Sequence, residues 1–305
     1  MKSRAICFWL FLALLLPFAS GCSVKKMAIN MVGNAMAESG ETFSSDDDPE
    51  LVMDATPFAL KLMESLLDSS PKHKGLLTAC CKNFTMYSYA HLQMEAEYCE
   101  SANYAKAQML RERARRLFRR AKDYGLRGLE ARSKGFQALL PKDPDKALSS
   151  FGKKDVETLY WAALSYLAYI NISKNDPAAM GDLDSAEKIM ARAYALDPDW
   201  DHGTLQEFYV TWDGSRPESM GGSVKRAREM YDKALELSKG RRVSTYLALA
   251  ESVSEKVQDR KEFDALLDKA LAVDVEADKS LNLVNRIYRK RALWLKEQAK
   301  VLFVE

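Results

Sequence analysis

The chain has 305 residues, of which 47% are hydrophobic and 29% are charged, with 45 basic and 43 acidic side chains. That length and apolar content suffice for a sizeable folded core. The nearly balanced charge argues against a nucleic-acid partner, because proteins that bind phosphates normally carry a basic excess.

The first residues have the layout of a secretory signal that ends at a cysteine. Two basic residues precede an apolar run over 5–19, and small residues at 19–21 lead into Cys22. A spanning helix needs about 20 apolar residues, and Pro17 interrupts this shorter run. We therefore expect residues 1–21 to be a cleaved signal peptide rather than a transmembrane helix.

The position of Cys22 resembles a lipobox, in which the thiol receives a diacylglycerol and becomes the first residue of the mature protein. Acyl chains stabilise membrane attachment by about 0.8 kcal/mol per buried methylene. Ser23, where Asp would retain a lipoprotein in the inner membrane, favours the outer membrane by resemblance to bacterial sorting. Ala19 stands where leucine is commoner, so the alternative is an ordinary signal followed by an incidental cysteine.

Residues 22–54 are expected to form the lipidated N-terminus and a flexible tether, because their Gly, Ser and Asp residues leave little apolar surface to bury. Asp48-Pro49-Glu50 then predicts a helix start, with an acidic N-cap and proline at the first helical position. Residues 55–305 show helical patterns separated by Gly, Pro and Asp, without strand-like alternation. We expect one all-α domain there.

The helical patterns share the spacing of the second helix of a tetratricopeptide repeat, in which small and large apolar residues alternate along one face. The best copy is Ala186, Met190, Ala193 and Pro198, and looser copies begin at residues 59, 114, 227 and 263. The starts are irregularly spaced. The sequence therefore predicts a tetratricopeptide-like solenoid of helical hairpins with degenerate repeats and insertions, and a generic helical bundle is the alternative.

No catalytic constellation or metal site is expected. Asp197, Asp199 and Asp201 imitate the start of a calcium loop, but His202 stands where the loop needs glycine. No histidine has zinc-site spacing, and no phosphate loop or nucleophile elbow is present. The cysteines at 80, 81 and 99 are expected to be buried small hydrophobes. We expect a protein that is not an enzyme and has no cofactor.

Aromatic residues gather in two places, on the pattern around 160–169 and in the segment 203–224, which is expected to be the longest irregular piece of the chain. Core packing explains most such residues, but apolar ligands need similar walls. The candidate ligand-lining residues are Trp161, Tyr166, Tyr209 and Trp212.

Arginine is densest over residues 111–120, where the simplest interpretation is a solvated helix surface. The alternative is a dock for an acidic protein or for anionic headgroups. The candidate docking residues are Arg115, Arg119 and Arg216.

Two segments carry a resemblance to a known family. Arg216-Pro217 followed by Gly221-Gly222, and the pattern with Tyr160-Trp161, together with the lipobox, resemble the TatT family, the T component associated with tripartite ATP-independent periplasmic (TRAP) transporters. The resemblance covers roughly residues 55–300. It implies a periplasmic lipoprotein without catalytic residues that assembles with itself, as a trimer, and docks a substrate-binding (P) protein. The pair would pass a small organic ligand, for which hydrophobic chemistry is one option.

The rival hypothesis is a tetratricopeptide lipoprotein scaffold for outer-membrane or envelope assembly. Such a scaffold would use the hollow of its solenoid to bind peptide segments.

Overall fold

The computed structural model describes residues 26–38 and 40–304, and all regular secondary structure in these residues is helical, which confirms the predicted all-α class. Residues 26–38 form the first helix. The α-helices that follow are α2 (Gly40–Ser44), α3 (Pro49–Ser69), α4 (Lys74–Tyr87), α5 (Met94–Cys99), α6 (Tyr104–Arg132), α7 (Phe136–Leu139), α8 (Pro144–Leu148), α9 (Val156–Ile172), α10 (Pro177–Gly181), α11 (Leu183–Leu196), α12 (Thr204–Ser215), α13 (Val224–Ser238), α14 (Val243–Leu249), α15 (Arg260–Ala272) and α16 (Asn282–Leu302). Two π-helical turns, η1 (Ser88–Gln93) and η5 (Ala250–Ser254), continue α4 into α5 and extend α14. Short 3-10 turns are η2 (Lys153–Asp155), η3 (Trp200–Gly203), η4 (Glu218–Met220) and η6 (Lys279–Leu281).

Side-chain caps fix where several helices begin. The Asp48 carboxylate accepts a hydrogen bond from the Leu51 amide at 3.0 Å, and Pro49 is the first residue of α3, so the predicted helix start is confirmed. Asn103 caps α6 and Asp143 caps α8 in the same way. Each cap satisfies an amide that the first turn of a helix leaves without an intrahelical acceptor.

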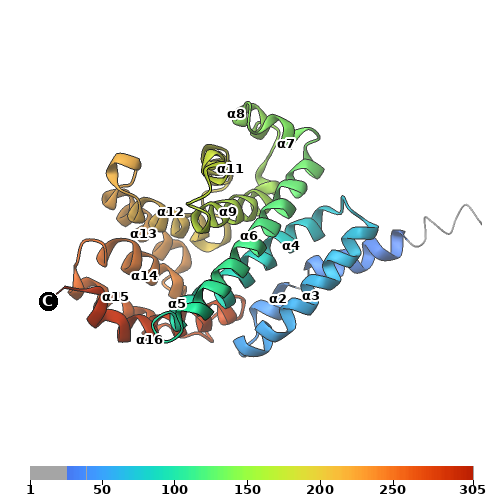
Figure 1. Ribbon diagram of the computed structural model, residues 1–305. Coiled ribbons are helices and arrows are strands. Elements are labelled where there is room, and N and C mark those ends of the chain that lie inside the picture. The colour runs from blue at the N-terminus through green and yellow to red at the C-terminus, as the bar shows by residue number, and fades with distance from the viewer. Residues whose placement is uncertain (1–25, 39, 305) are drawn as a thin grey trace, which may run out of the picture.

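Helices close together in the chain pack as pairs, namely α9 with α11, α12 with α13, and α14 with α15 (Figure 1). The repeat positions Ala186, Met190 and Ala193 are all fully buried on α11. The corresponding positions of α13 and α15 are buried as well. This arrangement is compatible with a tetratricopeptide-like solenoid.

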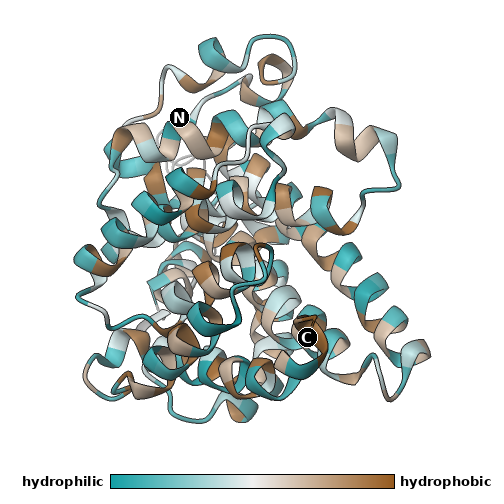
Figure 2. Cartoon of the chain, turned by 90° about the vertical axis from the view of Figure 1, so that its left-hand side faces the viewer, coloured by the Kyte–Doolittle hydropathy of each residue, from teal (hydrophilic) through white to brown (hydrophobic). Residues whose placement is uncertain are grey.

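The long helix α6 crosses both α4 and α9 at the centre of the N-terminal half (Figure 1). Gly125 makes the crossing close, since a β-carbon added there would lie 2.8 Å from the Cα atom of Ala162 on α9. Clusters of buried apolar residues run along the helix stack, and apolar residues concentrate where helices meet (Figure 2). The segment 203–224, predicted to be irregular, is largely helical: α12 occupies 204–215 and buries Leu205, Val210 and Gly214 as it packs on neighbouring helices that include α13 and α14.

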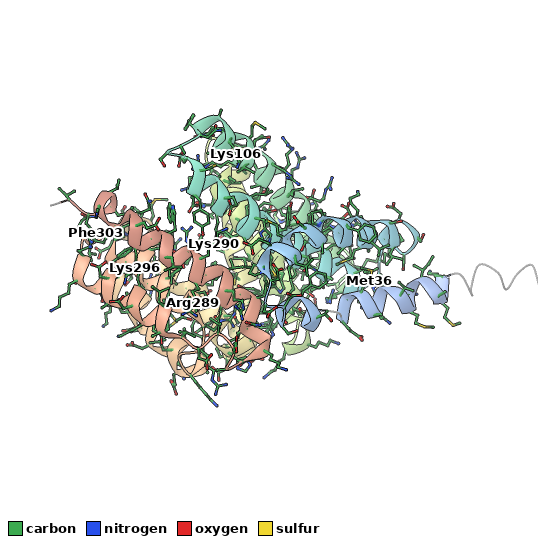
Figure 3. All side chains as sticks on the ribbon, turned by 90° about the horizontal axis from the view of Figure 1, so that it is seen from below. Met36, Lys106, Arg289, Lys290, Lys296 and Phe303 are labelled. Atoms are coloured by element: carbon green, nitrogen blue, oxygen red, sulfur yellow. The ribbon has the colours of Figure 1, made fainter. Side chains whose placement is uncertain are left out.

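The chain folds back so that its last helix packs against its first ones. Helix α16 contacts α2 and α3, and Figures 1 and 3 both show it beside these N-terminal helices. The Arg291 guanidinium of α16 is buried between Glu97 of α5, at 2.8 Å, and Glu251 of η5. Beside these two ion pairs, the rings of Tyr98 and Trp294 pack with their centroids 5.1 Å apart. These contacts join the C-terminal helix to the N-terminal part of the chain.

The N-terminal range for which a flexible tether is expected contains ordered helix. The helix at 26–38 packs against the start of α4, where Gly33 approaches the side chains of His73 and Leu76. Cys22 lies outside the described residues, and its lipidation stays a prediction. Among residues 26–38 and 40–304, no helix combines the length and the apolar content needed to cross a bilayer.

Candidate functional site

A groove of about 530 Å³ lies over α12, between α11 and α13. Figure 1 shows these two helices on either side of α12. The apolar lining of the groove is mostly aromatic or sulfur-containing, and the rest of the lining carries both signs of charge. The apolar lining residues are Met190, Ala191, Tyr194, Phe208, Tyr209, Trp212 and Met230; the charged ones are Asp184, Glu187, Lys188, Asp213, Arg216, Arg226 and Glu229.

The aromatic side chains of the groove form one continuous wall. Phe208 and Trp212 are four residues apart on α12, and their rings stack with centroids 5.5 Å apart and an interplanar angle of 21°. Tyr209 meets Tyr194 of α11 edge to face at 5.1 Å. Burial raises the pKa of Tyr209 to about 12, so its phenol remains a neutral hydrogen-bond donor at physiological pH. The wall can hold a flat apolar group and offer it a polar contact.

The guanidinium of Arg216 lies over the Trp212 ring of this wall. Its guanidinium is 4.2 Å from the centroid of the Trp212 ring, and its Nη1 atom is 3.2 Å from the Glu187 carboxylate. Its Nε donates to the backbone carbonyl of Trp212 at 3.3 Å. A guanidinium held on an aromatic face presents a planar set of donors, which matches the geometry of a carboxylate.

The backbone after Arg216 explains the glycine pair. Gly221 has φ +84°, which favours glycine, and a β-carbon on Gly222 would lie only 2.0 Å from the carbonyl oxygen of Arg216. The amide of Gly222 donates to the Pro217 carbonyl at 3.0 Å, and the amide of Ser223 donates to the Asp213 carbonyl at 2.9 Å. The turn that follows Arg216 therefore requires glycine at both positions.

Two cations fasten this turn to the rest of the molecule. Arg226 of α13 pairs with the buried carboxylate of Asp213 on α12, at 3.0 and 3.3 Å. Lys256 donates to the backbone carbonyls of Gly214 and Arg216, at 2.9 and 2.7 Å. Since both ends of the turn are held, the position of Arg216 over Trp212 is built into the fold.

Of the four predicted ligand-lining residues, the structure brings Tyr209 and Trp212 together and places the other two elsewhere. Tyr166 is buried in the core on α9, with the Lys122 ammonium 4.9 Å from its ring centroid. Trp161 meets Tyr160 edge to face at 5.0 Å, and its buried indole nitrogen has no hydrogen-bond partner among the described residues. Helix α9 is packed on most of its surface, so its aromatic residues fill the interior.

Only one of the three predicted docking arginines lines the groove. Arg216 belongs to the groove, whereas Arg115 and Arg119 lie on α6, which does not contribute to it. Arg115 forms a bidentate pair with Glu112, with both distances 2.8 Å, and Arg119 is exposed. These two residues lie on the solvated surface of a long helix.

Sequence reasoning missed several members of the groove. Phe208 and Trp212 have the four-residue spacing that places side chains on one helix face, and this signal was available. Tyr194 and Met230 carry no such signal, because they reach the groove from α11 and α13 through the packing of separate helices. The Tyr194 hydroxyl donates to the Met230 sulfur at 3.8 Å across this junction.

A smaller hollow of about 200 Å³ lies elsewhere, lined mostly by polar residues of η1, α12, α14, η5 and α16. Glu207 accepts hydrogen bonds there from the hydroxyls of Ser244 and Thr245, at 2.9 and 2.8 Å. Tyr89 and Tyr288 face each other across it with centroids 6.4 Å apart. Burial raises the pKa of both phenols, which keeps them neutral.

Two comparisons with known proteins bear on the family of the chain. The chain matches the family model described as the TRAP transporter T-component over residues 45–303. It is 27% identical over 321 residues to a protein of Treponema pallidum (strain Nichols), described as an uncharacterized protein, and the alignment covers 99% of each chain. The matched range includes every residue of the groove. The chain belongs to the TRAP transporter T-component family.

Proposed function

We propose that this chain is a non-catalytic, lipid-anchored component of the periplasm that docks the substrate-binding (P) protein of a TRAP transporter and helps pass a small organic ligand. Membership of the T-component family supports the association with a transporter. The lipobox-like sequence supports an anchor at Cys22, and Ser23 favours the outer membrane. Self-association, as a trimer, is the oligomeric state that we propose from the resemblance.

The groove over α12 is the observation that supports ligand binding. Phe208 and Trp212 offer stacked rings to the apolar body of a ligand, and Arg216 offers two donors to a carboxylate beside them. Arg216 is paired with Glu187, whose side chain is 36% exposed. An anionic group of a ligand can therefore replace Glu187 while the displaced carboxylate turns to solvent.

The test of ligand binding uses the mature chain from residue 22 with Cys22→Ser and the fluorescent probe 8-anilinonaphthalene-1-sulfonate, which combines flat rings with an anionic group. We expect Trp212→Ala and Arg216→Gln each to weaken probe binding about fivefold or more, with unchanged helical content. Tyr104→Ala is the matched control, because Tyr104 is an exposed aromatic residue of α6 outside the groove. Equal binding by all three variants would remove the groove from the proposal.

Docking is tested separately, by surface plasmon resonance against the substrate-binding protein of the same transporter. Arg119 is exposed on α6, and Arg115 lies one turn away in its pair with Glu112, so Arg115→Glu combined with Arg119→Glu makes this surface strongly negative and should slow association with an acidic partner about tenfold at low salt. Lys106→Glu, at the N-terminal end of the same helix, controls for a general charge effect. No measurable binding to the substrate-binding protein, with binding to peptide segments of outer-membrane proteins, would instead support the scaffold hypothesis.

A further inference from the structure

The helix at 26–38 packs one face on the protein and exposes several apolar side chains on its other side. On the packed face, a β-carbon on Gly33 would lie 2.8 Å from Leu76, and a β-carbon on Gly75 would lie 3.1 Å from Ala37. The exposed side carries Met27, Ala28, Met31, Val32 and Ala35, with the polar Asn34 and Glu38 towards the C-terminal end of the helix. Met27 and Met31 are 61% and 64% exposed, and Val32 is 49% exposed.

Polar contacts attach this helix to the residues between α3 and α4. The Ser70 hydroxyl donates to the Asn30 side-chain oxygen at 2.8 Å, and the His73 ring lies 3.3 Å from the Asn30 carbonyl oxygen. His73 also caps α4 by accepting from the Leu76 amide. The direction in which the apolar face points is therefore set by the folded protein.

The chain outside the described residues places this face near a membrane. Only four residue steps separate Cys22 from Lys26, a reach of at most about 14 Å. If Cys22 carries the lipid, the first turn of the helix stays within about 14 Å of the leaflet that holds the acyl chains. Figure 1 shows the helix at one end of the molecule, where the ribbon begins. Lys25 and Lys26 precede its apolar face, as expected for side chains that reach lipid phosphates.

We infer that the helix at 26–38 lies in the membrane surface with Met27, Met31 and Val32 inserted towards the acyl chains, and that it sets the orientation of the whole body relative to the bilayer. An apolar helix face buried at the boundary between headgroups and acyl chains is a stable mode of membrane contact. The reach of the lipid anchor favours the leaflet as the occupant over a second copy of the chain. This inference rests on the proposed lipid anchor, and it adds a second contact that the anchor alone does not supply.

The first experiment measures immersion depth in the full lipidated protein reconstituted in phosphatidylethanolamine–phosphatidylglycerol vesicles. A nitroxide is attached at Met31→Cys or, as the control, at Tyr104→Cys, in a Cys99→Ser background, because Cys80 and Cys81 are buried. We expect the nitroxide at 31 to be relaxed by oxygen and shielded from a water-soluble nickel chelate, and the control to show the opposite. A water-exposed nitroxide at 31 in vesicle-bound protein would overturn the inference, and so would dipolar broadening from a second label at 31.

The second experiment separates the helix from the anchor. The mature chain with Cys22→Ser should bind the same vesicles weakly, and Met27→Ser with Met31→Ser and Val32→Ser should lower its partition coefficient about tenfold or more. Met109→Ser with Met220→Ser is the control, since these methionines are 73% and 59% exposed elsewhere. Mass spectrometry of the native N-terminus tests the anchor itself. An unmodified Cys22 would refute the anchor, whereas equal partitioning of all variants would refute the role of the helix.

Discussion

The crossing of α6 with α9 gives the sharpest prediction about stability. In Gly125→Ala, the new β-carbon would lie 2.8 Å from the Cα and 2.9 Å from the Cβ of Ala162, and 2.9 Å from the Cys81 sulfur. Carbon atoms in contact normally lie about 3.5–4.0 Å apart. Because the nearest atom belongs to a backbone, no rotamer change can relieve the overlap, and the helices must move apart.

Two effects of opposite sign decide the outcome of Gly125→Ala. Overpacking a close-packed interior costs about 1–3 kcal/mol. Alanine in place of glycine inside a helix returns about 0.8–1 kcal/mol. Since the overlap is with a backbone atom, we expect the overpacking cost to lie at about 2–3 kcal/mol, which leaves a net loss of about 1–2 kcal/mol and a decrease in Tm of a few degrees.

The assay is thermal and urea unfolding followed by circular dichroism at 222 nm, on the mature chain with Cys22→Ser. The matched control is Gly181→Ala at the end of α10, where an added β-carbon would meet no atom within 4 Å. This control should be as stable as the parent or slightly more stable. A Gly125→Ala protein that equals the parent in stability would show that the helices are not held at this distance.

Three further predictions follow from the same structure. Gly222→Ala should lower stability by about 1–3 kcal/mol, measured by urea unfolding, and should weaken probe binding in the groove, because its β-carbon would displace the Arg216 carbonyl. Burial raises the pKa of the Cys80 and Cys81 thiols to about 12. Neither thiol should therefore react with Ellman's reagent at pH 8 until guanidinium unfolds the chain. Fast reaction of either thiol in the folded protein would contradict this prediction. Hydrogen bonds from Arg228 lower the pKa of Glu262 in the folded protein. The contribution of Glu262 to stability is therefore fully present above its unfolded-state pKa of about 4.3, and it is lost as the pH falls through the lower, folded-state pKa. Glu262→Gln should therefore cost about 1 kcal/mol at pH 7 and flatten the acid limb of the unfolding curve, which urea titrations at several pH values will show.

The helical class, the start of α3 and the buried face of the repeats could be predicted from the sequence. The cap at Asp48 acts within a few residues of chain, and the spacing of Ala186, Met190 and Ala193 depends only on the period of the α-helix. Such local features can be predicted without knowing which other parts of the chain lie nearby. The Gly221-Gly222 pair, one of the motifs behind the family resemblance, is also a local feature, since the turn requires glycine from its own backbone geometry.

Which aromatic residues meet could not be predicted in this way, because it depends on how helices far apart in the chain cross. Trp161 and Trp212 both lie in aromatic-rich helical segments of the sequence. In the structure, Trp161 packs on the core from α9, whereas Trp212 lines the groove between α11 and α13. Irregular insertions between repeats set those crossings, and no local rule fixes them. For the same reason the return of α16 to α5 through Arg291, and the docking of the helix at 26–38, emerge only when the whole chain is packed.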